Sequence, residues 1–167
     1  AEFVGYKGSA LADGKDDTEI TRLIQVASRW ICRITGRQFY DSGAASARTF
    51  MPPEGGDNVL EVNDFSTTTG LVAVDNGVTL TLGTDFYVAP LNGTNPAGET
   101  VAYYQLVRYY DIPWTEVNGG PTISITARWG WASAPPVAKQ ATAEVVSDLL
   151  RMKDNTFGFI GDRKSTR

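Results

Sequence analysis

The amino-acid sequence predicts an α+β protein, in which a small helical core of two long amphipathic helices carries an inserted antiparallel β subdomain. Two segments, 17–35 and 135–153, have apolar residues at helical spacing. The chain between them, 48–129, consists of short runs of β-forming residues separated by turn residues. A chain of 167 residues, 42% of them hydrophobic, has the size of one domain with a core. We therefore expect a single domain over 16–153.

The first predicted helix follows an N-terminal arm, 1–15, whose apolar residues are too irregularly spaced for a regular element. Asp16 and Glu19 have the spacing of a capping box, and Gly36 is a typical helix end. Between them lies one apolar stripe, formed by Ile20, Leu23, Ile24, Ala27, Ile31 and Ile34. This stripe is expected to pack against the second helix.

The opposite face of the first helix is basic. It carries Arg22, Arg29 and Arg33, and Trp30 lies at the border of the apolar stripe. A tryptophan in this position is either the rim of the core or a contact for a partner subunit, and the sequence leaves both interpretations open.

Seven short runs are expected to form the β subdomain. They are 48–51, 59–62, 71–75, 78–82, 86–89, 101–107 and an alternating run after Pro121 that buries Ile123, Ile125 and Ala127. The best-defined turn is Asn76-Gly77, because a two-residue type I′ hairpin needs positive φ at both positions. We expect a second turn at Gly83-Thr84.

The second helix starts at the prolines 135 and 136, which are tolerated in a first helical turn. Its apolar face holds Val137, Ala141, Val145 and Leu149, and its polar side holds Lys139, Glu144, Asp148 and Arg151. The remaining residues, 154–167, are expected to form an extended C-terminal tail. Phe157, Phe159 and Ile160 in this tail need cover, either under the chain's own core or on another chain.

The charge of −4 is unevenly distributed. No lysine or arginine occurs between Arg48 and Arg108, whereas seven carboxylates do: Glu54, Asp57, Glu61, Asp64, Asp75, Asp85 and Glu99. Such a region repels phosphates, which disfavours nucleic-acid binding by the β subdomain. No apolar run approaches the roughly 20 residues of a membrane span, and no leader pattern opens the chain, so we expect neither membrane insertion nor secretion.

The sequence contains few of the residues and motifs on which enzymatic catalysis usually depends. The sequence has no histidine, which removes the commonest general base and the commonest zinc ligand. Cys32, without a histidine partner, is expected to be structural. The trio Asp57, Glu61 and Asp64 has neither the setting of an acid–base pair nor the spacing of a calcium loop, and no phosphate-binding glycine motif is present. We expect no catalytic site, metal or cofactor.

Several motifs together resemble a known family. They are the helix with Thr35-Gly36-Arg37-Gln38-Phe39-Tyr40 at its end, the acidic hairpin with Val74-Asp75-Asn76-Gly77 and Leu82-Gly83-Thr84-Asp85-Phe86-Tyr87, and Ile125-Thr126-Ala127-Arg128-Trp129-Gly130-Trp131 before the last helix. In this order, over about 16–159, they resemble the head-to-tail connector (adaptor, or head completion) proteins of tailed double-stranded DNA bacteriophages.

This resemblance implies a virion structural protein in the neck, assembled in the host bacterial cytoplasm into a homo-oligomeric, dodecameric ring. The ring would lie between the portal protein and a stopper or tail protein, and DNA would pass through it without specific binding. We hypothesise that Arg22, Arg29 and Arg33, with Trp30, meet carboxylates of a neighbouring copy. We further hypothesise that Phe157, Phe159 and Ile160 dock on the portal or on an adjacent subunit.

The alternative is a β-rich recognition module of a tail or a cell surface. In that interpretation an aromatic platform binds carbohydrate by stacking, and its residues are Tyr103, Tyr104, Tyr109, Tyr110 and Trp114. A packed, hydrophobic strand face would explain the same aromatic residues without any ligand.

Overall fold

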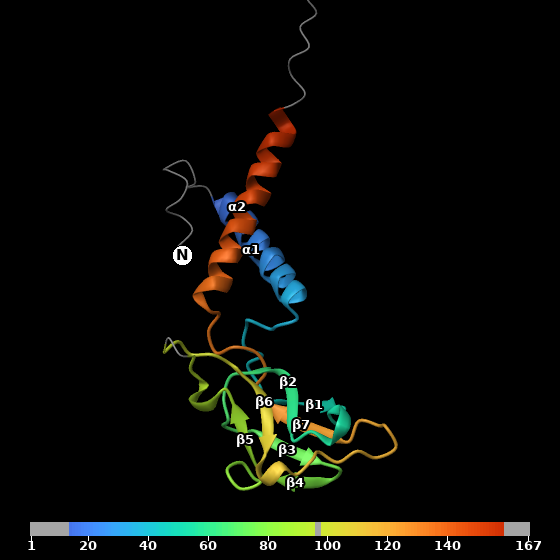
Figure 1. The fold of residues 1–167 in the computed structure, drawn as a ribbon. Helices are drawn as coiled ribbons and strands as arrows, with labels where there is room; N and C mark the ends of the chain where they lie inside the picture. Colours follow the sequence, from blue (N-terminus) through green and yellow to red (C-terminus); the bar gives the residue numbers. More distant parts are fainter. Residues whose placement is uncertain (1–13, 96–97, 159–167) are drawn as a thin grey trace, which may run out of the picture. The chain divides into compact units, whose positions relative to one another are not determined.

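The structure is a computed structural model that describes residues 14–95 and 98–158 (Figure 1). The chain divides into two compact units. The first contains residues 1–36 and 136–167, and the second contains residues 37–135. The second unit is thus a continuous insertion in the sequence of the first. The α+β class predicted from the sequence is confirmed, with two long helices and two antiparallel sheets in the described residues.

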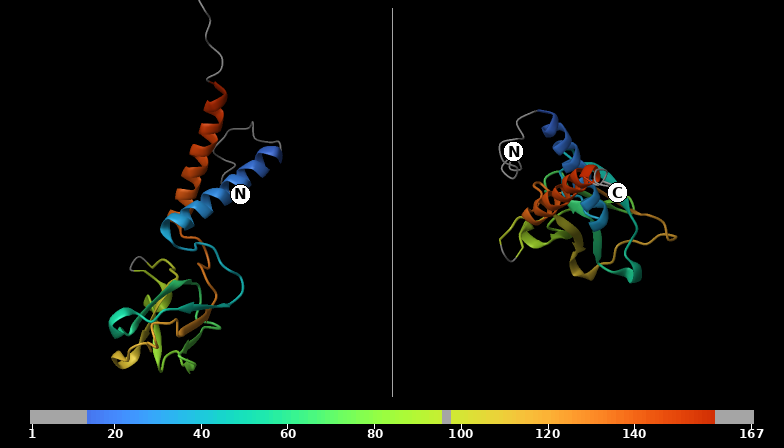
Figure 2. Two further views of the ribbon diagram at one scale, coloured as in Figure 1. Left: turned by 90° about the vertical axis from the view of Figure 1, so that its right-hand side faces the viewer. Right: turned by 90° about the horizontal axis from the view of Figure 1, so that it is seen from above.

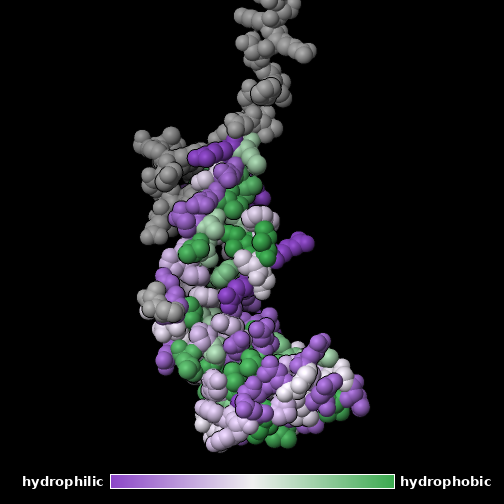
Figure 3. Space-filling model, in the orientation of Figure 1, coloured by the Kyte–Doolittle hydropathy of each residue, from purple (hydrophilic) through white to green (hydrophobic). Residues whose placement is uncertain are grey.

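The helical unit consists of α1 (Gly14–Thr35) and α2 (Pro136–Gly158). Its buried core comprises Leu23, Ala27 and Val146, with Val145, Leu149 and Leu150 partly buried around them. The two helices cross at an angle instead of running parallel (Figure 2). Apolar residues near the ends of the predicted stripes therefore stay uncovered: Ile34 is 62% exposed and Val137 is 79% exposed. Hydrophobic side chains accordingly remain visible on the surface of this unit (Figure 3).

Both helices are longer than the sequence predicts. α1 begins at Gly14, so Asp16 lies inside its first turn and not at the N-cap. α2 runs to Gly158, so the prediction of an extended tail is wrong for residues 154–158. No glycine or proline interrupts the chain between Pro136 and Gly158, and extending an existing helix avoids the cost of a new nucleus. The rest of the predicted tail lies outside the described residues.

The β unit contains seven described strands, each overlapping one of the predicted runs. They are β1 (Ser46–Phe50), β2 (Val59–Phe65), β3 (Val72–Asp75), β4 (Val78–Leu80), β5 (Phe86–Ala89), β6 (Tyr103–Arg108) and β7 (Ile123–Ala127). They form a four-stranded sheet of order β1-β7-β3-β4 and a three-stranded sheet of order β2-β6-β5. The pairing between neighbouring strands is antiparallel in both sheets.

The two sheets share one core. β7 contributes Ile123, Ile125 and Ala127, which are buried alternately, as predicted. Phe65 of β2 and Trp129 are fully buried, and the Trp129 indole donates to the Ser46 carbonyl oxygen at 2.8 Å. The core of the β unit thus combines side chains of both sheets with Trp129, whose indole is tied to the backbone of β1.

The predicted hairpin is also confirmed. β3 and β4 pair directly, and Asn76 (φ 46°) and Gly77 (φ 82°) connect them. Positive φ at both positions is the requirement of a type I′ turn, which only a few residue types meet without strain. The local sequence therefore fixes the register of this pair.

Candidate subunit interface

The arginines predicted to contact a neighbouring copy lie on the solvent side of α1. Arg29 follows the buried Ala27 by two positions, which places it roughly 200° round the helix and away from the core. Arg29 and Arg33 are both exposed, and neither forms an ion pair with another residue in the described ranges. Trp30 beside them is 54% exposed. This face of α1 is therefore open to a partner.

Arg22 differs from the other two arginines. Its guanidinium donates two hydrogen bonds of 2.9 Å to the carboxylate of Glu19, one turn earlier on α1. Hydrogen bonding to Glu19 raises the pKa of the Arg22 guanidinium. Because Arg22 already has a partner on its own helix, it contributes less to a new contact than Arg29 or Arg33 does.

The predicted docking residues near the C-terminus cannot be placed in the same way. Phe157 belongs to the last turn of α2, but its side chain lies outside the described residues, as do Phe159 and Ile160 entirely. Their docking role stays a prediction.

A buried carboxylate joins the two ends of the β unit, and sequence reasoning missed it. Asp64 is 5% exposed and accepts hydrogen bonds from Arg37 Nη2 at 2.7 Å and from Trp131 Nε1 at 2.8 Å. The bond to Asp64 raises the pKa of Arg37. The Phe39 ring lies 5.8 Å from the Trp131 ring. We call these four residues the Asp64 cluster.

The Asp64 cluster gives a structural role to two of the sequence motifs, 35–40 and 125–131. Arg37 and Phe39 belong to the segment after α1, and Trp131 belongs to the segment before α2. Asp64, which the sequence offered only as one of an acidic trio, holds both segments from the end of β2. Gly130 adds a backbone bond, since its N–H donates to the Asp64 carbonyl oxygen at 2.6 Å.

A second buried carboxylate reduces the acidic surface that the sequence predicts. Asp75 is 3% exposed and accepts hydrogen bonds from Arg108 Nη1 at 2.8 Å and from Thr115 Oγ1 at 3.0 Å. Asp64 and Asp75 are thus each the counterion of a different arginine of the β unit. Carboxylates that remain on the surface of the acidic segment include Glu54, Asp57, Glu61 and Glu99.

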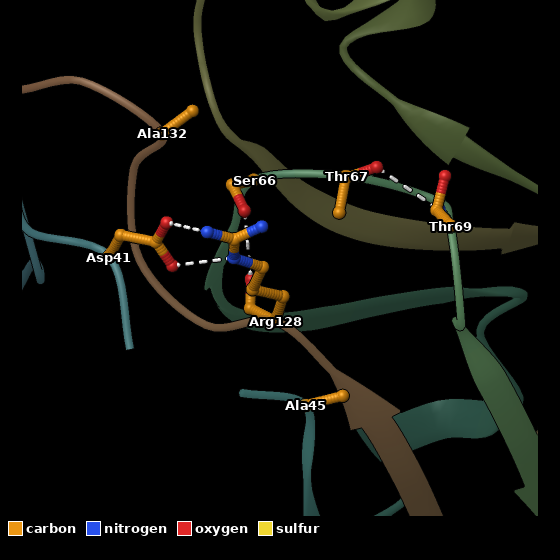
Figure 4. A pocket seen from close by; sticks show the side chains of 7 residues that line it. All are labelled: Asp41, Ala45, Ser66, Thr67, Thr69, Arg128 and Ala132. Carbon is orange, nitrogen blue, oxygen red and sulfur yellow. Dashed lines mark hydrogen bonds and ion pairs between the residues drawn. The ribbon is translucent and has the colours of Figure 1, made fainter. Parts of the chain in front are cut away.

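A polar pocket of about 530 Å³ opens on the β unit (Figure 4). Its lining residues are Asp41, Ala45, Ser66, Thr67, Thr69, Arg128 and Ala132. The guanidinium of Arg128 bonds both oxygens of the Asp41 carboxylate, so the two charges neutralise each other. The Ser66 hydroxyl donates to the Arg128 carbonyl oxygen at 3.3 Å. Because its charged groups are already paired, the pocket offers no activated nucleophile or base.

The titration of Asp41 should report this ion pair. The hydrogen bond from Arg128, with a further one from the Gly43 N–H, lowers the pKa of Asp41 below its ordinary value of 3.8. A lowered pKa contributes stability above that ordinary value, and the contribution is lost as the pH falls through the lowered pKa. We expect Arg128→Gln to move the midpoint of the Asp41 carboxyl carbon upward in NMR titrations.

A matched control is Arg48→Gln, which removes another cation of the β unit that does not bond Asp41. It should leave the Asp41 midpoint unchanged. A midpoint that stays in place after Arg128→Gln would mean that the ion pair does not persist in solution.

The aromatic residues of the alternative interpretation do not form one platform. Trp114 is 2% exposed and its indole donates to the Asn58 carbonyl oxygen at 3.0 Å. Tyr103 stacks on Phe65 in the core, with ring centroids 5.3 Å apart. Tyr104 follows Tyr103 in β6 and so points to the opposite face of the sheet. The exposed members of the set are Tyr104 (38%) in β6 and Tyr110 (89%) in the turn after β6.

Within residues 14–95 and 98–158, no group of three or more histidine, cysteine, aspartate or glutamate side chains is placed to hold a metal ion. None of the helices in these ranges combines the length and the apolar composition needed to cross a bilayer.

The chain was compared with protein-family models, curated proteins and solved structures. No protein-family model matches the chain, and neither does any curated protein sequence. Among solved structures, a chain of the neck of an empty GTA particle, computed with C6 symmetry, has a similar fold. The TM-score is 0.56 at 15% sequence identity, and the likeness covers 99% of this chain and 80% of that chain. At this identity the likeness establishes a shared fold.

Proposed function

We propose that this chain is a structural protein of the neck of a tailed bacteriophage or a related phage-like particle, where it acts as a head-to-tail adaptor. The observation that carries the proposal is the fold likeness to a chain of a GTA neck, over 99% of the sequence. Because this likeness includes the helices as well as the inserted β unit, it goes beyond a common sheet motif. The motifs around Arg37, Asp75 and Trp131 support the same assignment independently.

In this role the copies form a ring, dodecameric by the family resemblance, between the portal protein and a stopper or tail protein. The C6 symmetry applied to the neck particle supports a cyclic arrangement. The exposed Arg29, Trp30 and Arg33 support a protein contact on α1. Phe157, Phe159 and Ile160 dock on the portal or on a neighbouring copy.

DNA passes through the centre of the ring without specific binding. Exposed carboxylates such as Glu54, Asp57 and Glu61 support this part of the proposal, because they repel the phosphate backbone. Assembly takes place in the cytoplasm of the bacterial host, and the mature location is the virion neck.

Electron microscopy of the purified chain is expected to show rings with a central opening. Native mass spectrometry should give a mass that is an integral multiple of 18.1 kDa. The same density should then appear below the portal in the neck of the virion. A chain that stays monomeric at every concentration and is missing from the particle would overturn the proposal.

A further inference from the structure

The proposed ring requires a surface that receives the basic face of α1, and α2 carries a suitable one. Glu144 and Asp148 are each two positions from the buried Val146, which places both roughly 200° round the helix and away from the core. Glu144 is exposed, and the Asp148 side chain is 70% exposed. Val137 and Ala141 continue the same face at spacings of four and three residues. We call these four residues the α2 outer face.

The corresponding surface of α1 is equally compact. Val26 lies three residues before Arg29 and four before Trp30, and Arg33 follows these two by four and three, so the four residues share one side of the helix. Val26 is 48% exposed and Trp30 is 54% exposed. We call these four residues the α1 outer face. Each outer face thus combines two like charges with two apolar side chains, and the charges have opposite signs.

The charges of both outer faces are available for a new contact. Glu144 accepts a hydrogen bond of 3.0 Å from the uncharged Gln140. Asp148 lies 3.8 Å from Arg151, and both of these side chains are at least 70% exposed, so their attraction is weak. On α1, Arg29 and Arg33 have no ion-pair partner within the described ranges. Pairing across an interface would therefore cost little existing stability.

We propose that the α1 outer face of one copy packs on the α2 outer face of the next copy, with Arg29 and Arg33 pairing with Glu144 and Asp148. This inference rests on the proposed ring and names the surfaces that build it. α1 and α2 meet through their buried sides, so the two outer faces lie on opposite sides of the helix pair. A contact between two different surfaces repeats from copy to copy, and it builds a ring when the rotation between neighbouring copies closes.

The acidic segment of the β unit is a less suitable partner for the α1 outer face. Two carboxylates of that segment, Asp64 and Asp75, already neutralise arginines inside the β unit. The α2 outer face offers carboxylates together with exposed apolar surface, which matches the mixed character of the α1 outer face.

Two charge-reversal variants test the pairing. Variant A carries Arg29→Glu and Arg33→Glu, and variant B carries Glu144→Arg and Asp148→Arg. Each is expected to stay folded by circular dichroism and to lose assembly at a concentration at which the unchanged chain forms rings, because each alone places like charges across every contact. An equimolar mixture of A and B should recover rings of alternating copies, since both kinds of contact are then complementary.

Lys139→Glu is the control, because it reverses an exposed charge on α2 outside the outer face and should leave the rings intact. If the unchanged chain assembles but the mixture of A and B does not, the inference fails and the proposed function stands. If A and B assemble alone, the inference fails in the same way. If the unchanged chain forms no rings and does not occur in the neck, the proposed function fails with it.

Discussion

Replacing Gly130 with alanine is expected to destabilise the β unit by roughly 3 kcal/mol or more. Gly130 has a φ of +92°, and a Cβ at this position would lie 1.8 Å from the carbonyl oxygen of Tyr40. That oxygen belongs to the backbone, so it cannot rotate away as a flexible side chain would. Moving the two segments apart would also break the bond of 2.9 Å from the Ser42 N–H to the Trp129 carbonyl oxygen.

Urea unfolding followed by tryptophan fluorescence would measure this loss as a lower transition midpoint. Gly83→Ala is the matched control, because Gly83 has a similar φ of +83° but nothing within 4 Å of its Cβ position. Its cost should be about 1 kcal/mol, from the backbone conformation alone. Equal losses for the two variants would show that the close approach of Tyr40 does not constrain Gly130.

Replacing Asp64 with alanine is expected to cost about 3 kcal/mol of folding free energy. The change leaves the Trp131 indole without its acceptor and Arg37 without its counterion. Arg37 retains partial access to water, with 41% of its side chain exposed. This access keeps the expected cost at the lower end of the range for a broken buried ion pair.

Glu61→Ala provides the comparison, because Glu61 is an exposed carboxylate on the same strand, β2. It should change the free energy of unfolding by less than about 0.5 kcal/mol. Asp64→Asn should fall between the two alanine variants, since an amide oxygen can still accept the Trp131 indole while the charge is lost. An Asp64→Ala variant as stable as Glu61→Ala would show that the Asp64 cluster does not hold the ends of the β unit together.

Local patterns in the sequence predict the elements of this fold well. The alternation of Ile123, Ile125 and Ala127 predicts the burial of β7, and Asn76-Gly77 predicts the β3–β4 hairpin. Both signals come from residues close together in the chain, where the period of the side chains and the allowed φ values decide the structure. The lengths of the helices were harder to predict, because α1 and α2 continue beyond the apolar stripes that predict them.

The candidate site depends on contacts that local patterns do not report. Asp64 pairs with Arg37, which is 27 residues away in the sequence, and Asp75 pairs with Arg108, which is 33 residues away. Neither pairing is indicated by a periodic pattern of residues in the sequence. The exposure of Ile34 and Val137 is likewise a result of the crossing of the helices, which the spacing of apolar residues cannot encode. The basic face of α1 could be predicted from the sequence, because helical spacing alone places Arg29 and Arg33 together.

The insertion of the β unit between α1 and α2 also orders events during synthesis on the ribosome. About 100 residues separate Thr35 from Pro136, and at translation rates of roughly 5–20 residues per second they take about 5–20 s to make. During that interval α1 has emerged while its packing partner does not yet exist. The nascent polypeptide consequently completes the helix pair only after the whole β unit has been made.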